Sequence, residues 1–322
     1  WGRSGSTILD RVLGQVPGLV SLGELRSLWD EEQVADRCCS CGELVASCPF
    51  WGGLVADVLA DSGLDRPSDV ARLREAGART RHVALPGLGG RRAPGLGGEP
   101  ADAAAARYLA VVLSTDRHAL ARSGGDMVID SSKHPAEAFL LHSSPEVELT
   151  LVHLVRDPRA SAYSWGRATA GGPGGAESLP RYGPVFSSLR WSGWNLLTEM
   201  LGRRRGLRYV AVRYEDLMAE PRRQIRAVLE RAGVEADLLR FVGDREIELR
   251  ETHTALGNPS RFSSGIVTLS PDTAWATSMG ARDKLLATVP ALPLMARYGY
   301  PLRAHAAAAP GGSPLVFKPG RR

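Results

Sequence analysis

Three short apolar segments, each followed by a polar turn and a helical pattern, constrain the fold of this 322-residue chain most strongly. They span residues 126–130, 147–155 and 207–212. Apolar strands that alternate with helices are typical of a parallel sheet covered by helices on both faces. The sequence therefore predicts an α/β fold. Ligands of such sheets bind beyond the carboxyl ends of the strands, so the polar turns are the expected location of a site.

The first seven residues, Trp1-Gly2-Arg3-Ser4-Gly5-Ser6-Thr7, form a loop of small residues that runs directly into an apolar helical pattern. Its glycines let the backbone turn tightly and approach an anion closely. Hydroxyls of Ser4, Ser6 and Thr7 add donors to the free N–H groups at the helix start. The stretch predicts a phosphate-binding loop, with an ordinary helix start as the alternative. It is not a Walker A loop, because the Gly-Lys-[Ser/Thr] ending is missing and Arg3 stands early.

The remaining segments extend this layout. A short extended segment at 18–24 ends at Glu24, and an apolar helical pattern follows through Leu25, Leu28 and Trp29. Longer helices are predicted over residues 51–61, 101–122, 184–202 and 220–232. We expect one domain over residues 1–303, with mobile loops at 86–100 and 166–183 and a disordered tail at 304–322. The chain begins inside a motif, so a strand that should precede the loop is missing, and an upstream signal or anchor has room to exist.

Charge and hydropathy narrow the function. The formal net charge of +5 suits an anionic ligand but is too small and too scattered to indicate nucleic-acid binding. No apolar run approaches the roughly 20 residues that cross a membrane. Of the 40 basic residues only three are lysines, Lys133, Lys284 and Lys318. A lysine at a strand end, as Lys133 is, is therefore more informative in this chain than an arginine.

Four cysteines fall within one short stretch, at Cys38, Cys39, Cys41 and Cys48. Four cysteines could bind zinc, but an adjacent pair and the lack of paired C-x-x-C hooks fit a tetrahedral site poorly. A local disulfide or free structural thiols is the favoured interpretation, and we predict no metal.

Arg156 and Ser164 lie eight residues apart around the turn that follows the second predicted strand. Together with the loop at residues 2–7, this pattern resembles the family of sulfotransferases that use 3′-phosphoadenosine 5′-phosphosulfate (PAPS). The resemblance covers roughly residues 2–261 and implies a P-loop-like three-layer α/β/α fold with a central parallel sheet. It implies that Gly2, Arg3, Ser4, Gly5, Ser6 and Thr7 hold the 5′-phosphosulfate. It also implies that Arg156 and Ser164 hold the 3′-phosphate, a role that the planar donor fork of arginine suits.

Further roles follow from the same resemblance, which is closest to the bacterial and tyrosylprotein-sulfotransferase-like branch. Arg3 replaces the loop lysine of other members, and Glu24 stands at the spacing of the catalytic base. Lys133 matches a second cationic position. His134 is the rival base, since other members use a histidine from this region. The ligands implied at the adenine and at the late loop near the phosphates are Tyr214, Asn258 and Arg261.

The implied reaction is in-line transfer of a sulfonate group from PAPS to an acceptor hydroxyl, or an amine, with release of adenosine 3′,5′-bisphosphate (PAP). Glu24 takes the acceptor proton, while Arg3 and Lys133 stabilise charge on the transferring group and the departing phosphate. No magnesium-binding aspartate is recognisable at the strand ends. Small-molecule, carbohydrate and peptide acceptors all stay open.

Two other functions stay in competition with this one. An ATP-dependent small-molecule kinase could use the same strand–loop–helix, but it needs a Walker lysine and a metal site. A non-catalytic PAPS- or PAP-binding protein would not need Glu24, Arg3 and Lys133. An arginine-rich, lysine-poor composition is typical of bacteria with GC-rich DNA, for which a cytoplasmic enzyme is the default expectation.

Overall fold

The computed structural model describes residues 1–30, 37–80, 101–167, 180–235, 239 and 241–302. The expected loop at 86–100, most of the expected loop at 166–183 and the expected tail at 304–322 lie outside these residues.

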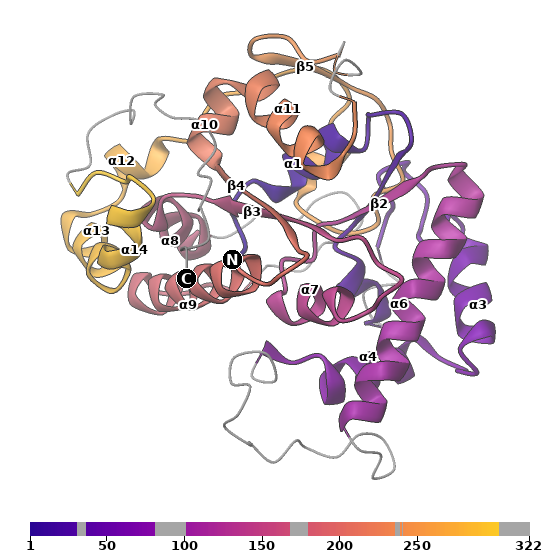
Figure 1. Ribbon diagram of the computed structural model, residues 1–322. Coiled ribbons are helices and arrows are strands. Elements are labelled where there is room, and N and C mark those ends of the chain that lie inside the picture. The colour runs from indigo at the N-terminus through magenta and orange to yellow at the C-terminus, as the bar shows by residue number, and fades with distance from the viewer. Residues whose placement is uncertain (31–36, 81–100, 168–179, 236–238, 240, 303–322) are drawn as a thin grey trace.

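Two pairs of parallel strands form the centre of the molecule (Figure 1). Strand β1 (Leu19–Gly23) pairs with β2 (Met127–Asp130), and Gly23 lies beside Asp130 at their carboxyl ends. Strand β3 (Thr150–Val155) pairs with β4 (Arg208–Arg213), and Val155 lies beside Arg213. The predicted strands and their parallel direction are therefore confirmed. A cavity of about 590 Å³ separates the pairs, lined by residues of both β2 and β3.

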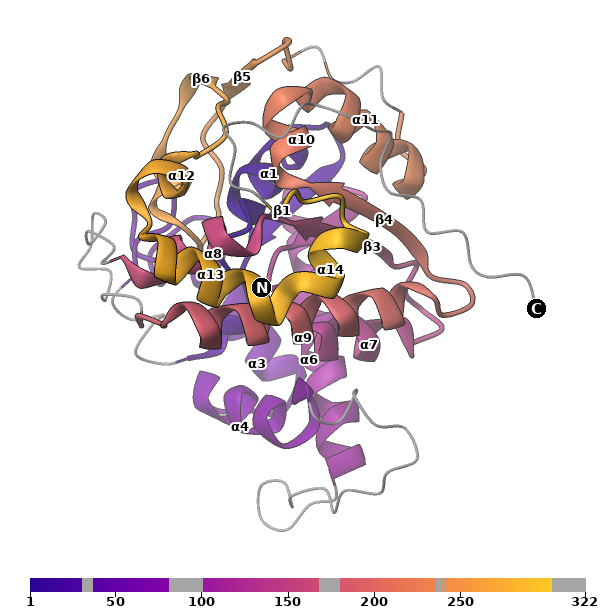
Figure 2. The same ribbon diagram turned by 90° about the vertical axis from the view of Figure 1, so that its left-hand side faces the viewer.

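Helices lie on both sides of these strands (Figures 1 and 2). On one side are α1 (Ser6–Leu13), α10 (Tyr214–Ala219) and α11 (Pro221–Ala232). On the other are α6 (Ala101–Ser123), α7 (Pro135–His142), α8 (Pro158–Gly166) and α9 (Pro184–Gly202). A buried apolar cluster joins α1 and α11 to the strands, with Leu9, Val12, Val212, Val228 and Leu229 among its members. The fold is thus a mixed α/β fold, with its parallel strands in two separate pairs.

A second apolar cluster lies beside the first strand pair, where α3 (Trp51–Asp61), α4 (Pro67–Gly77) and α6 pack together. It includes the fully buried Trp29 and Trp51 as well as Cys39 and Cys48. Residues 25–29, where the sequence predicted an apolar helical pattern, enter this cluster as a 3-10 helix, η1 (Leu25–Trp29). The backbone is extended at Asp30, directly after it.

The remaining elements complete the surface and were not predicted from the sequence. They are an antiparallel pair of β5 (Glu246–Leu249) and β6 (Gly265–Thr268), η4 (Pro259–Phe262), α12 (Ala274–Ser278), α13 (Ala281–Thr288), η5 (Val289–Ala291) and α14 (Leu292–Arg297). Within the described part of the chain, no helix combines the length and the apolar character that a membrane crossing requires.

Candidate functional site

Five of the predicted site residues follow the carboxyl end of a parallel strand. Glu24 follows β1, Lys133 and His134 follow β2, Arg156 follows β3 and Tyr214 follows β4. Within each strand pair these residues lie at the same edge. Their roles in a site stay predictions.

The loop at residues 1–7, hereafter the phosphate loop, has no room for a side chain at either of its two glycines. Gly5 has a φ of 88° and caps the start of α1, and a Cβ there would lie 2.5 Å from the ring of Tyr214. A Cβ on Gly2 would lie equally close, at 2.5 Å, to the ring of Trp165. Arg3 also adopts a left-handed conformation, with a φ of 66°. Two aromatic rings thus pack directly against the loop, and both of its glycines are needed for that packing.

Arg156 is buried beside the phosphate loop. Its Nη1 donates to the carbonyl oxygen of Arg3 over 3.0 Å, and its guanidinium lies over the Tyr214 ring at 4.5 Å from the centroid. Its Nη2 donates to Oδ2 of Asp272 over 3.0 Å. Asp157, the next residue along the chain, binds Arg159 through both carboxylate oxygens. Arg156 therefore links the carboxyl end of β3 to the loop.

Ser164 lies two turns into α8, on a half-buried stretch of that helix. Its neighbour Trp165 donates from Nε1 to the carbonyl oxygen of Gly2 over 3.3 Å. Arg3 lies over the same indole, 5.3 Å from the ring centroid. The carboxyl-terminal turn of α8 is thus attached to the phosphate loop, whereas the role of the Ser164 hydroxyl stays a prediction.

Glu24 and Lys133 form an ion pair between Oε1 and Nζ, although 109 residues separate them. Lys133 has a φ of 62°, and its carbonyl oxygen accepts a hydrogen bond from Nε1 of Trp194 over 3.2 Å. Asn and Asp tolerate that backbone region better than lysine does, so a lysine there carries strain that packing must offset. The indole of Trp194 fixes this backbone, and the ammonium is presented beside the carboxylate.

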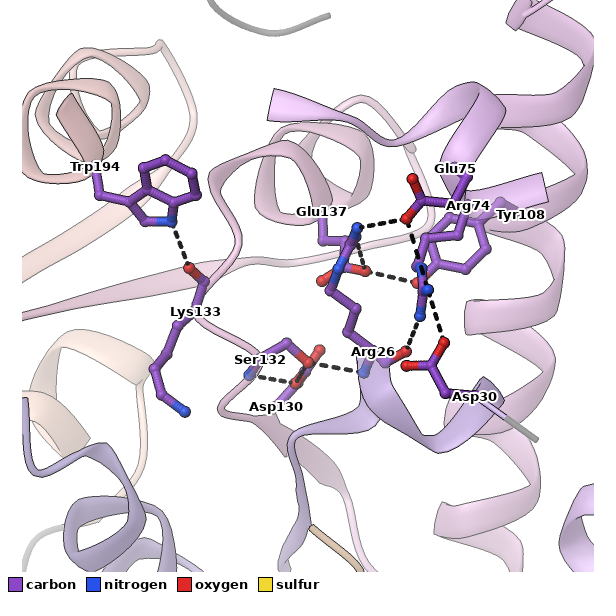
Figure 3. A network of polar contacts seen from close by, with 10 residues as sticks. All are labelled: Arg26, Asp30, Arg74, Glu75, Tyr108, Asp130, Ser132, Lys133, Glu137 and Trp194. Atoms are coloured by element: carbon purple, nitrogen blue, oxygen red, sulfur yellow. Dashed lines mark hydrogen bonds and ion pairs between the residues drawn. The ribbon is translucent and has the colours of Figure 1, made fainter. Parts of the chain in front are cut away.

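A buried polar network holds the turns that carry these two residues (Figure 3). Ser132 accepts from the backbone N–H of Arg26 over 2.9 Å and donates to Asp130. The Arg26 guanidinium forms an ion pair with Glu137 at 2.9 Å, and Glu137 also accepts from the hydroxyl of Tyr108 over 2.6 Å. Figure 3 shows these contacts converging from η1, α6 and α7. The network fixes the turn after β1 against the turn after β2.

A late loop covers the amino end of α1. The backbone N–H of Asn258 donates to Oγ1 of Thr7 over 3.3 Å, and Gly257 lies between Thr7 and Glu24. Arg261 donates a hydrogen bond from Nη1 to the carbonyl oxygen of Gly257, over 2.7 Å, and one from Nη2 to the carbonyl oxygen of Cys38, over 3.2 Å. The structure thus brings Asn258 to the phosphate loop. The guanidinium of Arg261 joins the late loop to Cys38. Contacts of Asn258 and Arg261 with a ligand stay predictions.

His134 is the less suitable of the two candidate bases. Burial, together with the cationic Arg26 and Arg74, lowers the pKa of His134 to about 3. Within the described residues, its Nδ1 is buried without a hydrogen-bond partner. Such an imidazole is neutral at pH 7 but a weak proton acceptor. Glu24 therefore stays the favoured candidate base, and its role is a prediction.

Asp130 is the one aspartate at the end of a described parallel strand. Its poorly solvated surroundings, together with the neighbouring Glu137, raise the pKa of Asp130 to about 7. Its Oδ1 accepts from both the backbone N–H and the hydroxyl of Ser132. These contacts give it a structural role in the turn after β2.

The sequence did not identify three residues that shape the site. Trp165 and Trp194 contact the phosphate loop and the Lys133 turn, and Asp272 binds Arg156. The sequence could have pointed to Trp165, since this residue directly follows Ser164, a predicted phosphate ligand. No sequence pattern points to Asp272, because it lies more than a hundred residues beyond Arg156.

Comparison with solved structures gives matches along nearly the whole chain. The chain resembles sulfotransferase domains. The sulfotransferase domain of the olefin synthase from Synechococcus PCC 7002 is 20% identical, with a TM-score of 0.40, over 94% of this chain and 92% of that chain. The sulfotransferase domain from the curacin biosynthetic pathway is 15% identical, with a TM-score of 0.46, over 94% of this chain and 96% of that chain. No protein-family model matches the sequence, and no curated protein sequence matches it.

Proposed function

We propose that the protein is a sulfotransferase that moves a sulfonate group from PAPS to an acceptor hydroxyl or amine and releases PAP. The observation that supports this most strongly is the position of Arg156, whose guanidinium lies against the backbone of the phosphate loop. A loop for one phosphate and a buried arginine beside it suit a nucleotide with phosphates at both ends of its ribose.

The donor set fits the 5′ end of such a nucleotide. Backbone N–H groups at the start of α1 and the hydroxyls of Ser4, Ser6 and Thr7 surround a loop without side chains at Gly2 and Gly5. A helix start of this kind favours negative charge. Arg3 and Lys133 add positive charge where a bridging oxygen becomes negative as it leaves.

The residues of this chain supply the rest of the chemistry. PAPS supplies the sulfonate: a bond forms from the acceptor oxygen to sulfur while the bond from sulfur to the phosphate oxygen breaks. Glu24 accepts the proton of the acceptor hydroxyl, and its ion pair with Lys133 places base and cation on the same side of the phosphate loop. Asn258 and Gly257 close the far side of the loop.

We also infer that the two strand pairs belong to one central parallel sheet of a P-loop-like three-layer fold. The cavity between β2 and β3 supports this inference, because Trp1, at the entry to the phosphate loop, is among its lining residues. An experimental structure of the protein tests it. Continuous backbone pairing across the four strands would support one sheet, and two pairs that stay separate would contradict it.

The functional test is a transfer assay with sulfur-labelled PAPS and a panel of phenolic, carbohydrate, lipid and peptide acceptors. A sulfotransferase transfers label to at least one acceptor and releases PAP in equal amount. A non-catalytic PAPS-binding protein binds PAP in calorimetry and transfers nothing to any acceptor. A kinase binds ATP with magnesium in preference to PAP. Absence of PAP binding would end the proposal.

A further inference from the structure

Three cysteines of the loop at residues 38–48 lie next to a histidine from a distant part of the chain. The Sγ atoms of Cys39, Cys41 and Cys48 and a ring nitrogen of His253 all lie within 4.8 Å of one another. Nδ1 of His253 is 3.3 Å from Sγ of Cys48 and 3.9 Å from Sγ of Cys39. The Sγ atoms of Cys41 and Cys48 are 3.7 Å apart.

These separations match the edges of a metal-centred tetrahedron. Zinc bonds of about 2.3 Å to sulfur and about 2.0–2.1 Å to nitrogen place two sulfurs about 3.8 Å apart, and a sulfur and a nitrogen about 3.5 Å apart. The two separations from His253 Nδ1 and the Cys41–Cys48 separation differ from these values by a few tenths of an ångström, and all four atoms lie within 4.8 Å of one another. We propose that Cys39, Cys41, Cys48 and His253 form a structural zinc site.

The local backbone brings the sulfurs together. The backbone N–H of Cys39 donates to the carbonyl oxygen of Glu43 over 2.7 Å, and Gly42, with a φ of 91°, donates to the carbonyl oxygen of Cys39 over 2.9 Å. The N–H of Cys48 donates to the carbonyl oxygen of Leu44 over 2.8 Å. The loop is thus a pair of tight turns, one carrying Cys39 and Cys41 and the other ending at Cys48.

His253 is held with its Nδ1 toward the sulfurs. Its ring stacks on Phe50, with centroids 5.6 Å apart and planes 9° apart. Its carbonyl oxygen accepts a hydrogen bond from Nε1 of Trp51. Ser40 exchanges backbone and side-chain hydrogen bonds with Thr254. Contacts of this kind, which orient a ligand from outside the coordination sphere, are typical of metal sites.

The sequence favoured a local disulfide or free structural thiols, and a disulfide explains less of this arrangement. All four cysteines are free thiols in the structure. A bond between Cys41 and Cys48 would use two of the four converging groups and leave the fully buried Cys39 facing His253. Cysteine spacing alone does not reveal His253, which follows Cys48 by 205 residues. With His253 as the fourth ligand, a tetrahedral site forms without paired C-x-x-C motifs.

A site with four protein ligands leaves no open position, so its role is structural. The three thiols lose their protons to become ligands, and the resulting cluster has one net negative charge beside the buried Arg261, which donates to Cys38. The segment fixed by His253 continues into Gly257 and Asn258 at the phosphate loop. Zinc would thus hold the wall of the candidate site. The inference itself does not depend on the proposed reaction.

The direct test is the metal content of the full chain, purified without a metal-affinity tag in a reducing buffer and supplied with zinc. We expect about one tightly held zinc per chain, and X-ray absorption at the zinc edge with about three sulfur neighbours and one nitrogen neighbour. Zinc below a tenth of an equivalent, a shell of oxygen and nitrogen alone, or a Cys41–Cys48 disulfide in unreduced protein would overturn the proposal.

Variants assign the ligands. Cys48→Ser and His253→Gln should each lower zinc content at least about tenfold, since a lost ligand also loses folding energy. Cys38→Ser is the matched control, because Cys38 lies in the same loop but outside the cluster, and it should keep its zinc. Zinc loss in Cys38→Ser equal to that in Cys48→Ser would contradict the assignment. If the ligand variants do not fold, chelation of the wild-type chain must lower its melting temperature, and an unchanged temperature would count against the site.

Discussion

The carboxylate of Glu24 and the ammonium of Lys133 form an ion pair across the carboxyl ends of β1 and β2. These residues come from turns that a buried network of Arg26, Ser132 and Glu137 holds together. The candidate base and the candidate cation are therefore presented as one unit at the phosphate loop. Their separate contributions can be measured, because neither residue contacts the Arg156 end of the site through any bond in the described structure.

Replacing the base should abolish turnover without abolishing nucleotide binding. Glu24→Gln keeps the size of the side chain but cannot take a proton, so we expect the single-turnover rate to fall by about 100- to 10,000-fold. Affinity for PAP, measured by calorimetry, should change only a few-fold.

The rival base provides the comparison. His134→Gln should lower the rate less than about tenfold, because the low pKa of His134 makes it a weak base. Near-normal turnover in Glu24→Gln together with a collapse in His134→Gln would reverse the assignment.

Asp272 should compete with the nucleotide for Arg156. Its Oδ2 occupies Nη2 of Arg156 at 3.0 Å, so a phosphate must share or displace it. In Asp272→Asn the negative charge is gone, while an oxygen still accepts from the N–H of Ala274. Because Asp272 is half exposed, we expect PAP to bind about two- to fivefold more tightly, in line with a surface ion pair. Weaker binding would mean that Asp272 orients Arg156 for the phosphate.

Gly5→Ala should damage the phosphate loop more than backbone strain alone explains. A left-handed non-glycine residue costs about 1–2 kcal/mol, and the new Cβ would also meet the Tyr214 ring at 2.5 Å. Gly124→Ala is the matched control, since Gly124 has a φ of 67° and open space around it. Chemical denaturation should show a clearly larger loss for Gly5→Ala, and equal losses would argue against close packing of Tyr214.

Asp10 should make stability depend on pH. Burial raises the pKa of Asp10 to about 7, while its pKa in the unfolded chain is about 3.9. Between these values the folded state binds more protons, so its contribution to stability is full below about pH 4 and is lost as pH rises toward 7. The slope is at most about 1.4 kcal/mol per pH unit.

Asp10→Asn removes this titration and leaves an oxygen for the hydroxyl of Ser21. The stability of the variant relative to wild type should therefore increase from pH 4 to pH 7 and then level off. A difference that stays constant over this range would show that Asp10 is not held in its protonated form.

The sequence predicted best those features that are encoded locally. Helices α3 and α9 begin and end as predicted, α9 because Gly183-Pro184 starts it and its apolar pattern is continuous. Turns at strand ends are also local, which is why Glu24, Lys133 and Arg156 could be assigned to the ends of strands.

Features that depend on distant parts of the chain were not predictable in the same way. Asp272 and His253 reach their partners only through the tertiary fold, and no spacing rule connects them to Arg156 or Cys48. Strands β5 and β6 have four residues each, too few for a reliable alternation of apolar and polar residues.

The central claim is that the phosphate loop and Arg156 hold opposite ends of one nucleotide. The most direct measurement compares, by calorimetry, the affinities of wild type and Arg156→Ala for PAP and for AMP, which lacks the 3′-phosphate. The account predicts that the variant binds PAP about 10- to 100-fold more weakly, the value of a charged hydrogen bond, while AMP binding is nearly unchanged. Equal losses for both nucleotides, or no loss for PAP, would contradict it.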